Sequence, residues 1–393
     1  MMRLRNILAI LLLTLVSGAC LGDRITVEQP SLLIRVRFPA LPEIETKAGA
    51  SEFAAELESE TAIKDLQIWI FLHDDFDAER KSGYCIGYLN SADIVFKKNY
   101  GSDPLTGFEN RYYVNIDKDI AQQHPAVDVY ALGNSGNSSI NPGSFNENTT
   151  RDYLDKFVIN GNYYGIKSSG TPTHTSVPNG GLPYSAVGKN MQMKGSYPVM
   201  NLDVVTLKRA VSKFRFVICQ LSDAAGPVTE FNIEELSLDE GQIATSEFLF
   251  NDSQNEYKID ASVSPKYLAK AAKFTAPAYA DVALNQSPQE YAYTPGQTQE
   301  EYEKVIYNGL KANVLTDLGK CYLRETDQPL AGRIKYTMPG VAGTQEKTFS
   351  MSEAGGFARN HSWIVYIYFL RDEMTFTVSW NEWLPGQDFN LYK

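Results

Sequence analysis

In the stretch SKFRFVICQL (212–221), the aromatic side chains of Phe214 and Phe216 alternate with charged ones. A period of two residues is typical of a β-strand that buries one face. The same pattern, with aromatic and β-branched residues, recurs in DLQIWIFL (65–72), ADIVFKK (92–98), RYYVNID (111–117), VDVYALGN (127–134), SWIVYIYFL (362–370) and MTFTVSW (374–380). Gly, Asn, Asp and Pro separate these runs, as they do between strands. We therefore expect a mainly β protein.

Helical patterns are few. We expect helices at NENTTRDYLDKFV (146–158), with Asn146 as the N-cap, and at QEEYEKVIYNGLK (299–311). The chain has 393 residues, enough for two substantial cores. The fold class expected is therefore two antiparallel β-sandwich domains with a few short helices in the connections, and a boundary near residues 202–209.

The chain begins with a short apolar run that ends at a cysteine. Arg3 and Arg5 precede about ten nearly continuous apolar residues (7–16), whereas a spanning helix needs roughly 20. The small residues 17–19 follow, and then Cys20. This order is that of a secretory signal. The cysteine directly after it indicates a bacterial lipoprotein, with a signal peptide over 1–19 and a lipid, such as palmitate, on Cys20.

One feature departs from the lipoprotein pattern. Ser17 stands where Leu is usual in the lipobox. The alternative is an ordinary secreted protein with an accidental cysteine at position 20.

Composition excludes several classes of function. The net charge of −11 argues against a nucleic-acid partner. Cys85, Cys219 and Cys321 are widely spaced without a CxxC motif, so no zinc site is indicated. Whether two of them form a disulfide cannot be determined from their spacing. We expect no cofactor and no metal.

A search for catalytic residues gives no constellation. In HDDFDAER (73–80), Asp75, Asp77 and Glu79 have the spacing that opens a calcium loop, but Arg80 stands where an EF-hand needs Gly. We interpret this stretch as a solvated turn after the strand 65–72. A second acidic pair, at 234–235, is adjacent in sequence, so its two side chains face opposite ways and do not suit joint acid–base work. We do not expect an enzyme.

Three stretches, in this order, resemble the fimbrillin family, the subunits of type V pili on Gram-negative anaerobes. They are VDVYALGN (127–134), GLPYSAVG (181–188) followed by LKRAVSKFRFVI (207–218), and FARNHSWIVYIYFLRDEMTFTVSWNEW (357–383). Tyr184 replaces the usual Met of the second, and Trp363 stands where Tyr is common in the third. In the third, Arg359 and Asn360 precede a strand, where their side chains can bind turn carbonyls. The resemblance implies two transthyretin-like β-sandwich domains.

The resemblance also implies processing of the N-terminal segment. In the family a lipidated precursor reaches the outer membrane, and a trypsin-like protease cuts after a basic residue. The first strand then leaves, and a strand of the next subunit takes its place. The candidate cleavage site here is Lys47–Ala48, in ETKAGAS (45–51). Arg37 is an alternative, as is an uncleaved linker.

The strand that would leave is SLLIRVRF (31–38). Its alternation places Leu32, Ile34 and Val36 on one face, which we expect to fill an edge groove of the sandwich. The expected division of the chain is 1–19 signal peptide, 20–47 lipidated propeptide with the first strand, 48–205 N-terminal domain and 206–393 C-terminal domain.

The favoured function is a structural and adhesive subunit of a cell-surface pilus. The partners would be other pilus subunits, the outer membrane through the precursor's lipid, and the processing protease. A surface glycan-binding lipoprotein that stays monomeric is the alternative, and a secreted hydrolase is a third. The sequence does not distinguish a shaft, tip or anchor subunit and does not identify an adhesion ligand.

Overall fold

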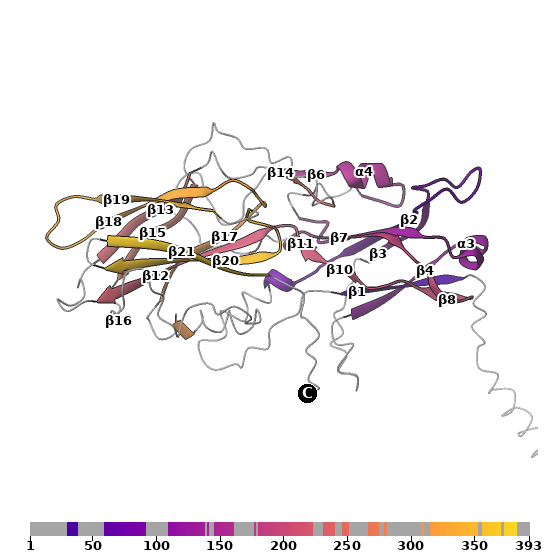
Figure 1. The fold of residues 1–393 in the computed structure, drawn as a ribbon, viewed down its shortest axis with the longest axis horizontal. Coiled ribbons are helices and arrows are strands. Elements are labelled where there is room, and N and C mark those ends of the chain that lie inside the picture. Colours follow the sequence, from indigo (N-terminus) through magenta and orange to yellow (C-terminus); the bar gives the residue numbers. More distant parts are fainter. Residues whose placement is uncertain are drawn as a thin grey trace, which may run out of the picture.

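The computed structural model describes residues 30–37, 59–91, 109–137, 140, 145–160, 177, 180–222, 231–239, 246–250, 266–274, 279–280, 308–309, 315–352, 356–370 and 373–382. Two groups of strands follow each other along the long axis of the molecule (Figure 1). In this part of the chain, no helix is both long enough and apolar enough to cross a bilayer. The prediction of a mainly β fold with a few short helices is confirmed.

The first group contains two sheets around one core. Sheet I consists of β1 (Ser31–Arg37), β4 (Glu109–Asn115), β8 (Lys194–Ser196), β9 (Val199–Asn201) and β10 (Val205–Thr206). Sheet II has the order β11 (Lys208–Arg209), β7 (Tyr184–Met191), β5 (Val127–Gly133), β2 (Leu66–Leu72) and β3 (Cys85–Ser91). Apolar side chains from both sheets, such as Ile34 of β1 and Ile68 of β2, form a single buried cluster between them.

The second group is built in the same way. Sheet III consists of β12 (Ser212–Ser222), β16 (Tyr279–Ala280), β17 (Thr316–Leu323), β20 (His361–Leu370) and β21 (Glu373–Glu382). Sheet IV has the order β15 (Lys266–Phe274), β13 (Phe231–Leu238), β18 (Leu330–Thr337) and β19 (Gln345–Met351). Phe214 and Phe216 of β12 lie in the core between sheets III and IV, as their alternation predicts.

Not every pairing is antiparallel. β1 runs parallel to β9 and β10, and β12 runs parallel to β16 and β20, whereas the other pairings described are antiparallel. Parallel neighbours require long crossover connections. Each group therefore has a strand in a sheet interior whose partners come from distant parts of the chain.

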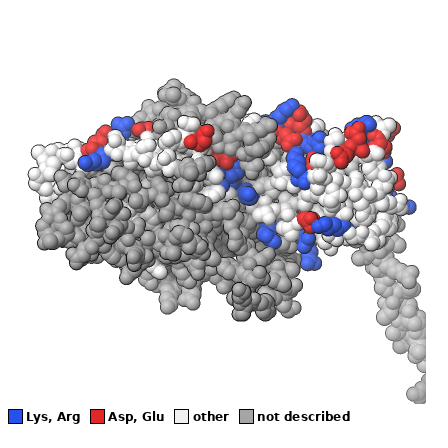
Figure 2. Space-filling view, viewed as in Figure 1, with Lys and Arg blue, Asp and Glu red and all other residues white. Residues whose placement is uncertain are grey.

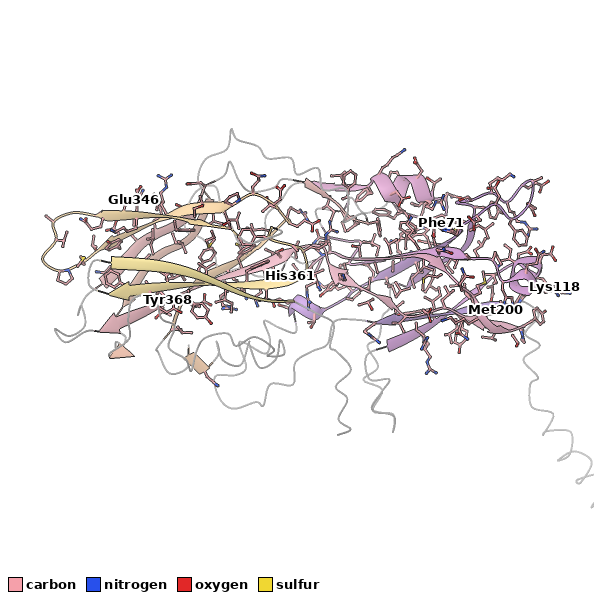
Figure 3. All side chains as sticks on the ribbon, in the orientation of Figure 1. Phe71, Lys118, Met200, Glu346, His361 and Tyr368 are labelled. Atoms are coloured by element: carbon pink, nitrogen blue, oxygen red, sulfur yellow. The ribbon has the colours of Figure 1, made fainter. Side chains whose placement is uncertain are left out.

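A third layer covers the outer face of sheet II. It contains α4 (Arg151–Lys156) and the two-stranded pairing of β6 (Val158–Asn160) with β14 (Ser246–Phe248). Trp69 and Tyr130, on the outer face of β2 and β5, are buried in a separate apolar cluster beneath this layer. In Figure 3, Phe71 marks this cluster and Met200 marks the core between sheets I and II. Because both faces are covered, β2 and β5 are buried along their whole length.

The predicted helix at 146–158 is wrong in its extent and its cap. The helix is α4, and its N-cap is Thr150, whose hydroxyl accepts the N–H of Tyr153. Asn146 instead accepts the N–H of Asn148 with its side chain, which forms a turn before the helix. Of the helix expected at 299–311, only residues 308–309 are described, and they are helical.

Several elements were not predicted, including β3, β7, β17, β18 and β19 and a short helix. β3 follows the turn 73–84, and α3 (Lys118–Gln123) follows β4, with Asp117 as its N-cap. The strand expected at 92–98 lies outside the described residues.

Candidate functional site

β1 lies in the interior of sheet I. It pairs antiparallel with β4 over its whole length, from Ser31↔Asn115 to Arg37↔Glu109. Its other edge pairs parallel with β9 at residues 31–33 and with β10 at residues 36–37. The expectation of an edge groove is therefore wrong, because β1 fills a slot between two sets of neighbours.

Main-chain hydrogen bonds hold both ends of β1. The N–H of Ser31 donates to the carbonyl of Pro198 at 2.9 Å, and the N–H of Leu207 donates to the carbonyl of Arg37 at 3.0 Å. In the middle, the N–H of Leu202 donates to the carbonyl of Leu33 at 3.1 Å. If β1 left, these groups and the facing edge of β4 would lose their partners.

The inner face of β1 is apolar and fully buried. Leu32, Ile34 and Val36 are each 0% exposed in the core between sheets I and II, which confirms the predicted alternation. Burial of such a side chain contributes about 1.5–3 kcal/mol. The slot thus has three apolar pockets, one for every second residue of β1.

The outer face of β1 is different in character. Leu33, Arg35 and Arg37 are half-buried there, and Arg35 Nη2 lies 3.4 Å from the carbonyl of Leu202. Cys20, Lys47 and Ala48, the predicted lipidation and cleavage residues, lie outside the described residues.

A buried ionic cluster joins the two groups of strands. Glu60 follows β1 in the chain, is 0% exposed, and accepts a hydrogen bond from Lys213 Nζ of β12 at 3.0 Å. The hydroxyl of Tyr322 of β17 donates to the other carboxylate oxygen of Glu60. The backbone carbonyl of Glu60 accepts from the Tyr184 hydroxyl at 2.6 Å and from Arg209 Nε at 3.2 Å.

Burial raises the pKa of the Tyr184 hydroxyl to about 12, so this phenol stays protonated and can donate to that carbonyl. The chain segment after β1 is thereby anchored where sheets II and III approach each other. No sequence pattern indicated this cluster, since isolated Glu and Lys residues are normally exposed.

A second buried pair reinforces the junction. Arg359 Nε donates to Glu325 at 2.9 Å, and its other nitrogens donate to the carbonyls of Leu249 at 3.1 Å and Phe248 at 2.7 Å. The prediction that Arg359 binds turn carbonyls is confirmed. Asn360 has a left-handed backbone with φ 59°, and its side chain accepts the N–H of Arg209 at 3.1 Å.

The acidic stretch 73–80 is the turn that its sequence predicts. Asp77 accepts the N–H groups of Glu79 and Arg80, and Asp75 accepts that of Ser82 at 3.0 Å. These hydrogen bonds lower the pKa of both aspartates. Among the described residues, no group of three His, Cys, Asp or Glu could hold a metal ion.

Asp128, near the start of β5, has a more elaborate environment that the sequence did not indicate. It is 1% exposed and is contacted by His73 Nδ1 at 2.7 Å, Arg151 Nη1 at 2.9 Å and the N–H of Asn190 at 2.9 Å. Burial acts to raise the pKa of Asp128, but the hydrogen bonds from Asn190 and His73 and the charge of Lys189 outweigh it, so this pKa lies below its ordinary value. The contacts tie the turn 73–84, α4 and β7 together.

Two of the cysteines carry free thiols. Cys85 of β3 is partly buried and Cys321 of β17 is fully buried, and burial raises the pKa of both. A thiol whose pKa is raised is a poor nucleophile.

The glutamates 234 and 235 lie in β13, where they bind different partners. Glu234 is exposed and accepts from the Thr344 hydroxyl at 3.0 Å, whereas Glu235 lies 3.6 Å from Lys335 Nζ. The prediction that they do not work as a pair agrees with these contacts.

No family model matches the sequence, and no curated protein matches it. Solved structures are similar to it over most of the chain. They include a candidate cell adhesion protein from Bacteroides eggerthii (11% identity, TM-score 0.49, covering 92% of this chain and 98% of that one). Another, from Parabacteroides distasonis, has 13% identity and a TM-score of 0.49, and covers 91% and 98%.

A third similar structure is the tip fimbrial protein Mfa3 from Porphyromonas gingivalis, with 13% identity and a TM-score of 0.44, covering 90% of this chain and 100% of that one. The first two are candidate cell adhesion proteins, and the third is a fimbrial tip protein.

Proposed function

We propose that this protein is a structural subunit of a cell-surface pilus with a role in adhesion. It is exported as a lipoprotein with its lipid on Cys20, held at the outer membrane, and cut between Lys47 and Ala48. Assembly then replaces β1 by a strand of a neighbouring subunit. The observation that carries this proposal is the slot occupied by β1, which is open to pairing on both edges once β1 leaves.

The energetics of β1 suit removal after cleavage. Three buried side chains and a set of main-chain hydrogen bonds hold it. These contacts retain the strand while the chain is intact. After a cut at 47–48 no covalent bond ties it to the sandwich, and the vacated slot exposes apolar pockets and unpaired backbone, a template for strand addition.

The donor strand would need apolar side chains at the positions of Leu32, Ile34 and Val36. The C-terminal residues 374–393 are one candidate source of such a strand. In this structure, however, 373–382 form β21 and pair with β20 from Leu370↔Glu373 to His361↔Glu382. A donor drawn from this region would have to leave sheet III or use the residues after 382.

The test is assembly in cells that carry Lys47→Ala, with Lys47→Arg as the control that keeps a basic residue. Lys47→Ala should accumulate as a monomer with residues 31–38 retained, whereas Lys47→Arg should form ladders that resist mild denaturation. N-terminal sequencing of the filaments should begin at Ala48. Filaments of Lys47→Ala that still contain residues 31–38 would contradict strand replacement.

The alternative is a glycan-binding lipoprotein that stays monomeric. Exposed tyrosines such as Tyr113 and Tyr197 provide faces on which sugars can stack. A monomer with an intact N-terminus that binds polysaccharide would favour this function over the pilus subunit.

A further inference from the structure

The outer face of sheet I carries an unusual share of exposed apolar surface. Of the six exposed large hydrophobic residues in the described chain, Tyr113 (58%), Tyr197 (45%) and Val199 (38%) belong to this sheet or its β8–β9 hairpin. Half-buried Leu33 lies directly opposite Tyr113, and Val199 lies opposite Ser31. These residues surround the start of β1. Gathered exposed apolar side chains indicate an interaction surface.

The same face presents two arginines side by side. Arg35 of β1 lies directly opposite Arg111 of β4, and both side chains are on the outer face. Like charges in directly opposed positions destabilise a sheet. Their juxtaposition therefore has no benefit for folding and suits an anionic partner. Lys194, elsewhere on this sheet, pairs with Asp203 at 2.6 Å.

Figure 2 shows Lys and Arg side chains along the lower border of the first group of strands, where Figure 1 places β1. This face carries aromatic and cationic side chains, as membrane-surface contacts do. In such contacts Tyr lies at the headgroup level and Arg binds phosphate. We call it the sheet I face, defined by Leu33, Arg35, Arg111, Tyr113 and Val199.

The position of the sheet I face in the chain points to the same partner. Cys20, the proposed lipid-bearing residue, is separated from Ser31 by ten residues. Ten residues span at most about 35 Å. The apolar residues lie at the end of β1 that this tether reaches, because Ser31 is the first residue of the strand.

We infer that the sheet I face rests on an anionic phospholipid surface in the lipidated precursor. This inference rests on the proposed function for the lipid on Cys20. The lipid holds the protein at the membrane, and the sheet I face sets its orientation, with sheet I toward the bilayer and sheet II away from it.

The overall charge of −11 does not oppose this contact. Exposed charges are screened beyond about 8 Å at physiological ionic strength, so the headgroups respond to the arginines they touch rather than to the total charge.

The contact has a built-in release. Leu33 and Arg35 belong to β1, whereas Arg111 and Tyr113 belong to β4. When β1 is replaced, the sheet I face loses two of its five residues, Leu33 and Arg35. Strand replacement would thus free the subunit from the bilayer at the same moment as it joins a filament.

The test uses residues 20–393 with Cys20→Ser, a chain that contains every described residue and no lipid. Sedimentation is measured with vesicles of phosphatidylcholine and with vesicles of phosphatidylcholine and phosphatidylglycerol at 7:3. The protein should bind the anionic vesicles in low salt and be released by 0.5 M salt. Arg35→Glu should weaken binding at least tenfold, although it places a favourable opposite charge beside Arg111 and so preserves the fold.

Lys347→Glu on β19 is the matched control, since it makes the same charge change at an exposed position of sheet IV and should bind like the unaltered chain. Tyr113→Ser should also weaken binding. Equal binding by Arg35→Glu and Lys347→Glu would overturn the inference. So would binding to soluble polygalacturonate without binding to vesicles, which would assign the sheet I face to an acidic glycan.

Failure here is distinguishable from failure of the proposed function. Fatty-acid labelling of the unaltered precursor tests Cys20 alone, and the Lys47 variants test assembly alone. Vesicle binding without fatty-acid labelling would support the membrane contact of the sheet I face and contradict the lipid on Cys20. Labelling without vesicle binding would support the lipid and contradict the membrane contact.

Discussion

β1 and β12 occupy equivalent places in their sandwiches, yet they are held in opposite ways. Each lies in a sheet interior, with an antiparallel neighbour on one edge and parallel neighbours on the other. β1 meets its parallel neighbours only at its two ends, whereas β12 pairs with β20 from Lys213 to Gln220.

The charged residues of the two strands differ even more. On β1 they are half-buried on an open face, and on β12 Lys213 and Arg215 are buried and paired with Glu60 and Asp317. The two strands thus share apolar inner faces and differ in their charged residues, which form buried ion pairs on β12 and are half-buried on the outer face of β1.

The largest effect should come from breaking the anchor of β12. Lys213→Met leaves the Glu60 carboxylate buried with the Tyr322 hydroxyl and with Lys320 Nζ, which lies 3.9 Å away. Removing one partner of a buried ion pair costs about 3–5 kcal/mol, which should appear in urea unfolding. Lys213→Met combined with Glu60→Gln should recover most of this loss. If Lys213→Met alone lowered the free energy of unfolding by less than about 1 kcal/mol, the pair of Lys213 and Glu60 would not be what anchors β12.

A smaller loss should follow from emptying one pocket of β1. Ile34→Ala removes a fully buried side chain and should cost about 3 kcal/mol. Leu33→Ala, on the half-buried face of the same strand, is the control and should cost less than about 1 kcal/mol. Equal costs for the two would mean that the inner face is not the one that holds β1.

Acid should loosen sheet II, which lies across the core from β1. The pKa of Asp128 is lowered in the folded protein, so its contribution is fully present above the unfolded pKa of about 3.9 and is lost as the pH falls through the lower folded value. The urea midpoint of the unaltered protein should therefore fall more steeply below pH 4 than that of Asp128→Asn. Parallel pH profiles would exclude Asp128 as the group responsible.

The smallest change in the free energy of unfolding is expected for a substitution on the outer face of β1. Arg35→Ala should change the free energy of unfolding by no more than about 0.5 kcal/mol, because the side chain is half-buried and its 3.4 Å contact with Leu202 is long. Arg215→Ala at the matching place on β12 should cost several times more, since it removes a buried side chain and its ion pair with Asp317. Thermal unfolding of the two variants side by side measures the contrast directly.

Local periodicity was enough to predict several strands but not others. β2, β5, β12 and β20 were predicted because aromatic and β-branched residues recur through them. β3 (CIGYLNS) was missed because Gly87 interrupts its pattern. A Cβ at Gly87 would lie 2.6 Å from Val114 Cγ1, so the close packing of β3 on β4 requires a glycine at this position. The same glycine interrupts the alternating pattern by which the strand could have been predicted. α3 was missed because six residues are too few to show a helical period.

The candidate site, too, could be predicted only in part from the sequence. The two faces of β1 follow from its own sequence, but its interior position does not, because its neighbours β4 and β9 come from distant segments. The buried pair of Glu60 and Lys213 was also beyond prediction. The sequence around Glu60 or Lys213 does not distinguish either residue from an ordinary solvent-exposed charged residue. Only the packing of the two sandwiches against each other brings them into contact.

The pairing of β6 with β14 has a consequence for the order in which the protein is made. Val158 meets Phe248 across this pairing, so about 90 residues must emerge after β6 before its partner exists. At 5–20 residues per second, this interval is roughly 5 to 20 seconds. Throughout it, the apolar layer around Trp69 and Tyr130 lacks the cover that Leu249 and Phe250 later provide. A folding intermediate in which residues 246–250 are not yet in place would therefore expose this apolar cluster and be prone to aggregation.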